Sequence, residues 1–278
     1  MKSTIKQIKQ ILCHWLKLST YDLLLCCKWF NPLATIYLNF RSFPLKQAFH
    51  LPVYVYGRPH MYFLTGNMYV EGKIERGMIK FNCTAIGAPN NMSMQTDLQN
   101  QGKIIFHGGG FIGTGNKIRV SHNGILEFGE DFNIADQVNV GCYSKIKIGS
   151  HARVAHRCQI LDSNYHYVAN LNKRIIPQWK KPISIGDYCW LGNSSTITGG
   201  VTLPNYSIVG SNSLVNKDFS SIPMGSIIAG VPAKYIASGF RRVFNKKYEI
   251  EIDNYYTDNP NGLYIIDDKI YPEYITTI

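Results

Sequence analysis

The chain has 278 residues, of which 45% are apolar and only 17% are charged, and its formal net charge is +11. The apolar content excludes a disordered chain, because enough surface is available for burial. The basic excess favours an anionic partner, such as nucleic acid, a membrane surface or an acidic small molecule. Seven cysteines without a C-x-x-C pair argue against a disulfide framework or a thiolate zinc site and favour a reduced, cytoplasmic protein.

We expect an N-terminal helical segment over residues 1–50. Apolar residues recur there at helical spacing, at Ile5, Ile8, Ile11, Leu12, Trp15 and Leu16, and the opposite face is basic. Such a helix packs against the protein or a neighbouring subunit, or it lies on a membrane surface. No apolar run approaches the ~18 residues of a spanning helix, and no signal-peptide cleavage pattern follows it. We therefore expect neither a transmembrane helix nor a signal peptide.

The most regular pattern is a six-residue repeat that begins at residue 185. Aliphatic residues recur every six positions, at Ile185, Leu191, Ile197, Leu203, Val209 and Val215. The residue four positions after each of them is mostly small. The large residue would fill the interior of a flat strand, and the small one would fit a tight corner, where Gly and Asn supply unusual dihedrals. Three such faces close one coil, so the repeat predicts a parallel β-helix.

The repeat extends upstream and is interrupted once. Earlier hits fall at Phe128, Ile134, Val140 and Ile146, then after a slip of two residues at Ile148, Val154 and Ile160, with less regular ones at Phe106, Ile112 and Ile118. Residues 162–182, in the gap before Ile183, are polar and basic, so we expect a loop that protrudes from the coil and serves function. We predict a β-helix over 51–232 and a C-terminal helix and tail over 233–278. The tail, over 249–278, carries no functional interpretation.

Four pieces of sequence resemble the hexapeptide-repeat acyltransferases. They are the repeats from Ile185 to Ser220, the stretch CWLGNSSTITGGVT, the loop sequence ILDSNYH and the ending AGVPAKYI at residues 229–236. The similarity is strongest to the bacterial branch that O-acetylates sugars of surface glycans. It implies an all-β solenoid with left-handed coils, acetyl-CoA as the donor, a sugar hydroxyl of a glycan or its precursor as the acceptor, and no metal. It also implies a homotrimer with active sites between subunits.

The loop contains the candidate catalytic residues. Transfer of an acyl group to a hydroxyl needs a general base, for which histidine is suited. Among eight histidines, His166 lies in the loop, four residues after Asp162, and by resemblance it takes the catalytic position of the family. Asp162 either orients the imidazole or caps the backbone of the loop itself. A backbone N–H of the Thr198-Gly199-Gly200 corner is a candidate donor to the oxyanion.

The resemblance also implies a coenzyme-binding set. Lys234 in the G-V-P-A-K motif and Lys217 match basic positions of the family, Trp190 matches an aromatic position near the pantetheine, and Ser211 belongs with them. Lys217 could instead be a solvated corner residue, and Trp190 could pack between coils.

In the family a second basic residue commonly follows the G-V-P-A-K motif by three positions. Ala237 occupies that position here, so Arg241 or Arg242 would have to replace it. The segment after residue 233 carries Ile236, Phe240, Val243 and Phe244, which would share one face of a helix. We expect that helix to cap the open end of the coil, because uncovered β-edges aggregate.

Two other functions are compatible with the repeat. His151 and His156 have the five-residue spacing of ligands in β-helix metalloenzymes of the carbonic-anhydrase type, although Ser150 shifts their register by one residue. A non-catalytic, glycan-binding solenoid is the second, but it would need neither the loop histidine nor the Lys234 motif.

The positive charge is concentrated in the N-terminal segment. Residues 1–50 carry seven Lys or Arg and one acidic residue. We therefore interpret the charge as coenzyme-binding lysines plus a helix that could contact the inner face of the membrane, and not as nucleic-acid binding.

Overall fold

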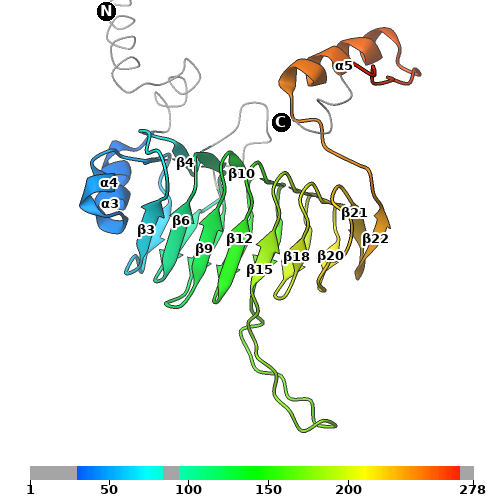
Figure 1. Ribbon diagram of the computed structural model, residues 1–278. Helices are drawn as coiled ribbons and strands as arrows, with labels where there is room; N and C mark the ends of the chain where they lie inside the picture. The colour runs from blue at the N-terminus through cyan, green and yellow to red at the C-terminus, as the bar shows by residue number, and fades with distance from the viewer. Residues whose placement is uncertain (1–29, 84–93, 270–278) are drawn as a thin grey trace, which may run out of the picture.

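The computed structural model describes residues 30–83 and 94–269, and a parallel β-helix occupies most of them (Figure 1). The amphipathic helix expected over residues 5–16 lies outside the described residues. None of the helices in the described part of the chain combines the length and apolarity that crossing a bilayer requires.

Each coil contributes one strand to each of three sheets. The first sheet contains β1 (Val53–Val55), β4 (Ile79–Phe81), β7 (Gly110–Ile112), β10 (Phe132–Ile134), β13 (Arg153–Val154), β16 (Trp190–Leu191), β19 (Ile208–Val209), β21 (Ile227–Gly230) and β22 (Ala233–Ala237). The second contains β2 (His60–Tyr62), β5 (Asp97–Asn100), β8 (Lys117–Val120), β11 (Asn139–Cys142), β14 (Gln159–Leu161), β17 (Thr196–Thr198) and β20 (Leu214–Val215). The third contains β3 (Asn67–Val70), β6 (Lys103–Phe106), β9 (Ile125–Phe128), β12 (Lys145–Ile148), β15 (Ile183–Ile185) and β18 (Thr202–Leu203).

The coils stack in register, so their inward side chains form continuous apolar columns. In the first sheet Ile134 pairs with Val154, which pairs with Leu191, and Val209 follows on the next coil. All four are buried. Each fully buried aliphatic side chain contributes about 1.5–3 kcal/mol of transfer free energy, which accounts for the strict six-residue period. The predicted all-β fold, a left-handed β-helix, is confirmed.

The corners confirm one part of the repeat hypothesis and correct another. The small residues do occupy the corners, where Cys189, Ser195 and Ser207 are fully buried. However, the residue before each of them is left-handed without being Gly or Asn, as at Tyr188 with φ of 58° and Tyr206 with φ of 63°. The stacked coils impose this conformation and outweigh its local cost, which is of order 1–3 kcal/mol.

Helices α3 (Pro32–Ser42) and α4 (Leu45–Ala48) lie at the N-terminal end of the coil (Figure 1). The amide of Asn39 accepts from the Val53 backbone N–H at 3.2 Å and donates to the Val53 carbonyl at 2.7 Å. Thr35 Oγ1 accepts from the Val55 N–H at 3.0 Å. Two polar side chains of α3 therefore satisfy the edge of β1, which would otherwise be an open template for aggregation.

The C-terminal segment differs from the prediction. Residues Ala233–Ala237 form strand β22, which pairs antiparallel with β21, and the helix, α5 (Lys246–Asp258), begins well after residue 233. The prediction that Ile236, Phe240, Val243 and Phe244 share one helical face is wrong. Pairing with β22 satisfies the free edge of β21, so the hairpin, rather than a helix, closes this edge. Figure 1 shows α5 joined to the hairpin by an extended segment.

The four described cysteines are all buried. Burial raises the pKa of Cys142 and of Cys189 to about 12. We therefore expect both thiols to resist alkylation in the native protein at about pH 8, because the thiolate is the reactive form. Peptide mapping after a pulse of iodoacetamide should find Cys142 and Cys189 unmodified in buffer and modified in urea. Modification of either one in the folded protein would contradict this packing.

Candidate active site

The loop that interrupts the repeat is an arm that leaves the corner between the second and third sheets, after β14 and before β15 (Figure 1). Antiparallel bridges join its two halves, between Ser163 and Lys180 and between Asn170 and Ile175. The arm exposes apolar side chains that a solvated loop would not carry, with Leu171 82% and Ile176 64% exposed. Such a surface is typical of a segment that contacts a partner.

Asp162, at the base of the arm, is fully buried. One carboxylate oxygen accepts from the Tyr143 N–H at 2.8 Å, and the other accepts from the Ser144 N–H at 2.6 Å. Burial raises the pKa of this carboxyl, and the two backbone donors oppose the shift. Asp162 thus holds the corner of the preceding coil, and no hydrogen bond or ion pair between the described residues joins it to His166.

Gly199 lets the arm lie against the next coil. Thr198 pairs with Leu161, so the corner that begins at Gly199 lies directly beside the base of the arm. A Cβ added at Gly199 would lie 2.7 Å from the Asp162 carbonyl oxygen and 3.1 Å from that of Lys181. The Lys181 N–H also donates to the Asp162 carbonyl at 2.8 Å, which ties the two ends of the arm together.

Replacing Gly199 with Ala should therefore displace the base of the arm. Both contacts of the new Cβ are with backbone atoms, which cannot rotate away, so we expect a stability loss of about 1–3 kcal/mol and a fall in activity. Chemical denaturation and a transferase assay would measure the two effects. A variant with unchanged stability and turnover would contradict the close approach.

His166 lies in the exposed part of the arm and makes no hydrogen bond within the described residues. Its neighbours are aromatic and fix the chain around it. The rings of Tyr165 and Tyr143 lie 5.1 Å apart, and Trp179 lies 5.5 Å from Tyr143. The Lys180 Nζ donates to the Tyr143 carbonyl at 3.1 Å. The base of the arm is therefore packed, while the imidazole remains open to a substrate.

The corner that faces the arm offers one backbone donor. The Gly200 N–H already donates to the Pro182 carbonyl at 3.0 Å. The Gly199 N–H makes no hydrogen bond within the described residues, so it is the donor of this corner that remains for an oxyanion. Lys217, just after β20, lies at the same edge of the prism, with its Nζ 5.2 Å from the Phe219 ring centroid.

The structure separates the other predicted coenzyme residues from this edge. Trp190 and Lys234 lie on the first sheet, in β16 and β22, and both are exposed. Ser211 lies at the corner between the first and second sheets. Within one chain, therefore, His166, Gly199 and Lys217 share one edge of the prism, whereas Trp190, Lys234 and Ser211 lie on another face and corner.

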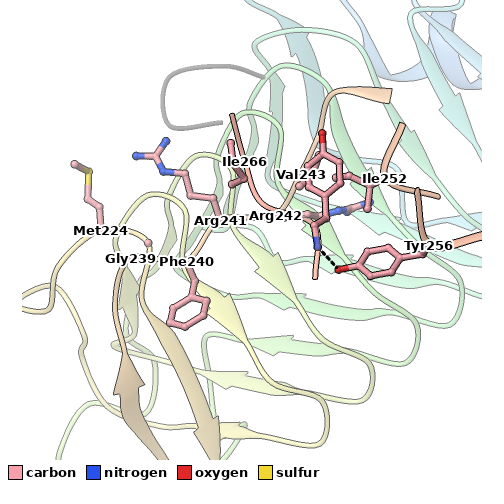
Figure 2. A pocket seen from close by; sticks show the side chains of 11 residues that line it. Met224, Gly239, Phe240, Arg241, Arg242, Val243, Ile252, Tyr256 and Ile266 are labelled. Atoms are coloured by element: carbon pink, nitrogen blue, oxygen red, sulfur yellow. Dashed lines mark hydrogen bonds between the residues drawn. The ribbon is translucent and has the colours of Figure 1, made fainter. Parts of the chain in front are cut away.

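A pocket of about 490 Å³ lies between the last coil and α5 (Figure 2). Phe240, Arg241 and Arg242 of the segment that joins β22 to α5 line it, together with Ile252 and Tyr256 of α5. The Arg242 guanidinium lies 5.6 Å from the ring centroid of Trp190, so it is close to the candidate coenzyme-binding residues on the first sheet. Burial lowers the pKa of Arg242, and the nearby Arg153 lowers it further.

His151 and His156, the candidate ligands of the metalloenzyme alternative, do not lie together. His151 Nδ1 lies 3.0 Å from the Asp131 carboxylate, and its ring stacks on Tyr188 with centroids 4.5 Å apart. His156 lies at a different corner of the prism. Within residues 30–83 and 94–269 no three His, Cys, Asp or Glu side chains converge as a metal site would require.

Some residues at the site have no counterpart in the sequence hypotheses. Tyr143 and Trp179 build the base of the arm, and Arg119 donates to the Tyr143 hydroxyl at 3.3 Å. Three successive coils contribute one residue each to an outward row of the second sheet, namely Arg119, Gly141 and Leu161. An alignment of the sequences of successive coils would have predicted this row, whereas single hexapeptides do not show it.

The repeat and the arm are similar to those of the hexapeptide-repeat acetyltransferases, and the sequence comparisons support this resemblance. No protein-family model matches the chain. Among curated proteins, the putative lipopolysaccharide biosynthesis O-acetyl transferase WbbJ of Escherichia coli is 29% identical over 147 residues, which cover 50% of this chain and 74% of WbbJ. The probable acetyltransferase Rv3034c of Mycobacterium tuberculosis is 32% identical over 45% of this chain and 41% of its own length.

A solved structure of the hexapeptide-repeat acetyltransferase VCA0836 of Vibrio cholerae, complexed with acetyl-CoA, shares 28% identity with a TM-score of 0.35. That alignment covers 41% of this chain and 60% of VCA0836. The sequence similarity to curated acetyltransferases such as WbbJ confirms the predicted resemblance to bacterial sugar O-acetyltransferases and the predicted enzyme class, an acyltransferase.

Proposed function

We propose that this protein transfers the acetyl group of acetyl-CoA to a hydroxyl of a sugar in a surface glycan or its precursor. The observation that carries the proposal is the anchored arm, which presents an exposed histidine beside the Gly199 N–H, a group that makes no hydrogen bond within the described residues. The similarity to sugar O-acetyltransferases supports the donor and the acceptor class. A scaffold has no need for such an arrangement.

The chemistry follows from the groups at this edge. His166 removes the proton of the acceptor hydroxyl as its oxygen attacks the thioester carbonyl, and a C–O bond forms. The carbonyl oxygen becomes an oxyanion that the Gly199 N–H stabilises. When the intermediate collapses, the C–S bond breaks, and the imidazolium returns its proton to the departing thiolate. The products are an acetyl ester and free CoA.

We assign Asp162 a positioning role, since its carboxylate bonds the corner and not the imidazole. It acts on His166 through the geometry of the arm. The coenzyme phosphates would be held by Lys234 and Arg242, with Arg241 close by in the same pocket, because planar guanidinium groups suit phosphate oxygens. Trp190, 5.6 Å from Arg242, would line the path of the coenzyme.

A homotrimer would unite the separated groups. The edge with His166 and the face with Trp190 and Lys234 are on different sides of one prism, so a site that needs both takes one group from each of two subunits. The exposed apolar residues of the arm, such as Leu171, would be buried in that contact. Sedimentation of the full chain would test the assembly.

The location at the inner face of the membrane is part of the proposal. Helix α3 exposes Leu33, Ile36 and Tyr37, which are 79%, 50% and 50% exposed, near the basic Arg41. An apolar surface next to basic residues suits anionic lipid. Co-sedimentation with vesicles containing phosphatidylglycerol would show binding that falls with added salt.

The proposed reaction is tested by incubating the protein with acetyl-CoA and a panel of oligosaccharides and nucleotide sugars. Free CoA should appear only when an acceptor is present, in equal amount to an ester that mild base removes. Acceptor-dependent formation of an amide would show transfer to an amino sugar instead, and CoA release without any acceptor product would contradict the proposal.

A further inference from the structure

A groove of about 270 Å³ lies on the outward face of the second sheet, on the N-terminal side of the arm. It is lined by residues of four neighbouring strands of this sheet and by one residue of the arm, namely Tyr62, Asp97, Gln99, Lys117, Ile118, Arg119, Asn139 and Tyr165. Its volume is near the lower end of the roughly 300–1,000 Å³ usual for small-molecule pockets. That size suits one sugar unit.

The groove is directly connected to the proposed catalytic edge. Parallel pairing places Gln99, Arg119, Gly141, Leu161 and Thr198 in one outward row that runs from the groove to the corner facing the arm. Tyr165, which forms the wall of the groove on the arm side, directly precedes His166. A sugar in this groove therefore lies next to the proposed base, while Lys217 lies beyond the arm on the C-terminal side.

Aromatic side chains from two different elements line the groove. Tyr62 of β2 and Tyr165 of the arm are 39% and 45% exposed, so each of the two rings is accessible to a ligand. Gly141 makes the position of Tyr165 possible, because a Cβ there would lie only 2.8 Å from the Tyr165 hydroxyl oxygen. Exposed tyrosines combined with amide groups provide the apolar faces and hydrogen bonds that a sugar ring requires.

Arg119 is fixed in the groove by neutral partners. Its Nε donates to Gln99 Oε1 at 3.0 Å, and its Nη1 donates to the Tyr143 hydroxyl at 3.3 Å. The hydrogen bond to Tyr143 is the main reason that the pKa of Arg119 is raised. A guanidinium has five N–H donors, so three remain for a ligand. No carboxylate within the described residues pairs with it, which leaves its charge uncompensated.

The charge of the groove limits the ligand further. Lys117 and Arg119 are positive, and Asp97 is negative and lies 3.4 Å from His60 Nδ1. The formal sum of the lining charges is therefore +1, with histidine neutral. A carboxylate carries one negative charge and matches the guanidinium fork, whereas the diphosphate of a nucleotide sugar would need more positive charge.

We propose that the acceptor is an acidic sugar and that Arg119 binds its carboxylate in this groove, with Lys117 assisting and with Tyr62 and Tyr165 against the ring. The inference rests on the proposed function, because it names the acceptor of the same site. No residue of the groove takes part in the transfer of the proton or the acetyl group.

The test is equilibrium binding, which needs no turnover. Isothermal titration should show that a disaccharide containing glucuronic acid binds about 10- to 100-fold more tightly than its glucose counterpart, the range expected of a charged hydrogen-bonded pair. Arg119→Gln should abolish that preference. Arg157→Gln is the matched control, since Arg157 Nε also donates to a glutamine, Gln137, at 3.2 Å. Arg157 lies at the corner between the first and second sheets and does not line the groove, so this variant should bind like the wild type.

The results separate the two proposals. Equal binding of the acidic and neutral disaccharides, or an unchanged preference in R119Q, would overturn the acidic-sugar inference even if acetyl transfer to some glycan were found. If R119Q weakened UDP-glucose and UDP-glucuronic acid equally, phosphate rather than carboxylate would be recognised, which would also overturn it. Preferential binding of the acidic sugar without any acetyl transfer would support the proposed carboxylate site in the groove and contradict the proposed enzyme activity.

Discussion

Replacing His166 with Ala should lower kcat for acetyl transfer by about 10²–10⁴-fold, the usual contribution of a general base. The fold should not change, because the side chain is exposed and makes no hydrogen bond within the described residues. Steady-state assays of CoA release and thermal unfolding would measure the two effects on the same preparation.

His107→Ala is the matched control for this variant. His107 is also an exposed histidine, and it lies 3.4 Å from Glu71 at a corner away from the arm. It should turn over at the wild-type rate. Near-normal turnover in H166A, or an equal loss in H107A, would remove His166 from the role of the base.

Replacing Asp162 with Ala should destabilise the protein by about 2–5 kcal/mol, because two backbone N–H groups would lose a buried, charged acceptor. The arm should also lose its anchor, so turnover should fall together with stability. Chemical denaturation and the CoA-release assay would measure both. If Asp162 instead oriented the imidazole directly, turnover would fall with little change in stability.

Asp218→Ala is the control for the Asp162 variant. Asp218 also accepts two hydrogen bonds, from the Ser220 N–H at 3.1 Å and the Ser220 hydroxyl at 2.7 Å, but its carboxylate is exposed to solvent. Water replaces such an acceptor, so the stability of this variant should stay close to that of the wild type. A comparable loss in both variants would mean that burial is not the cause.

The repeat predicted the fold because one inward residue per strand is a strong constraint. Leu191 and Val209 stack in register, and a polar residue at either position would bury a polar group without a hydrogen-bond partner in the apolar column. The slip between Ile146 and Ile148 has a simple cause, since both lie in β12 and both point inward. The corner conformations were harder to predict, because a coil can impose a left-handed φ on Tyr188 that its side chain alone disfavours.

The prediction of a helix directly after residue 233 failed because local periodicity carries no information about long-range strand pairing. Ile236, Phe240, Val243 and Phe244 have a helical spacing, but β21 ends with an unpaired edge that the following residues can satisfy. Pairing with that edge depends on the position of β21 in the folded coil and not on the spacing of apolar residues along the chain. The helix therefore forms only after Asn245, whose side chain accepts from the Lys247 N–H.

The candidate site residues were proposed from the sequence, but their arrangement could not be predicted from it. The interruption of the repeat made His166 and Asp162 candidates, yet the hydrogen bonds of Asp162 depend on Tyr143 and Ser144 of the preceding coil. The separation of Trp190 from the arm likewise follows from which sheet each strand enters. Both are consequences of the coil register, which becomes visible only when successive coils are aligned.

The central claim is that the anchored arm serves acetyl transfer to a sugar hydroxyl. The most direct measurement is mass spectrometry of an oligosaccharide panel after incubation with acetyl-CoA and either wild-type protein or H166A. We predict that at least one glycan gains a base-labile acetyl ester with the wild type and almost none with H166A. Absence of acetylated product from every glycan, or the same yield from both proteins, would contradict it.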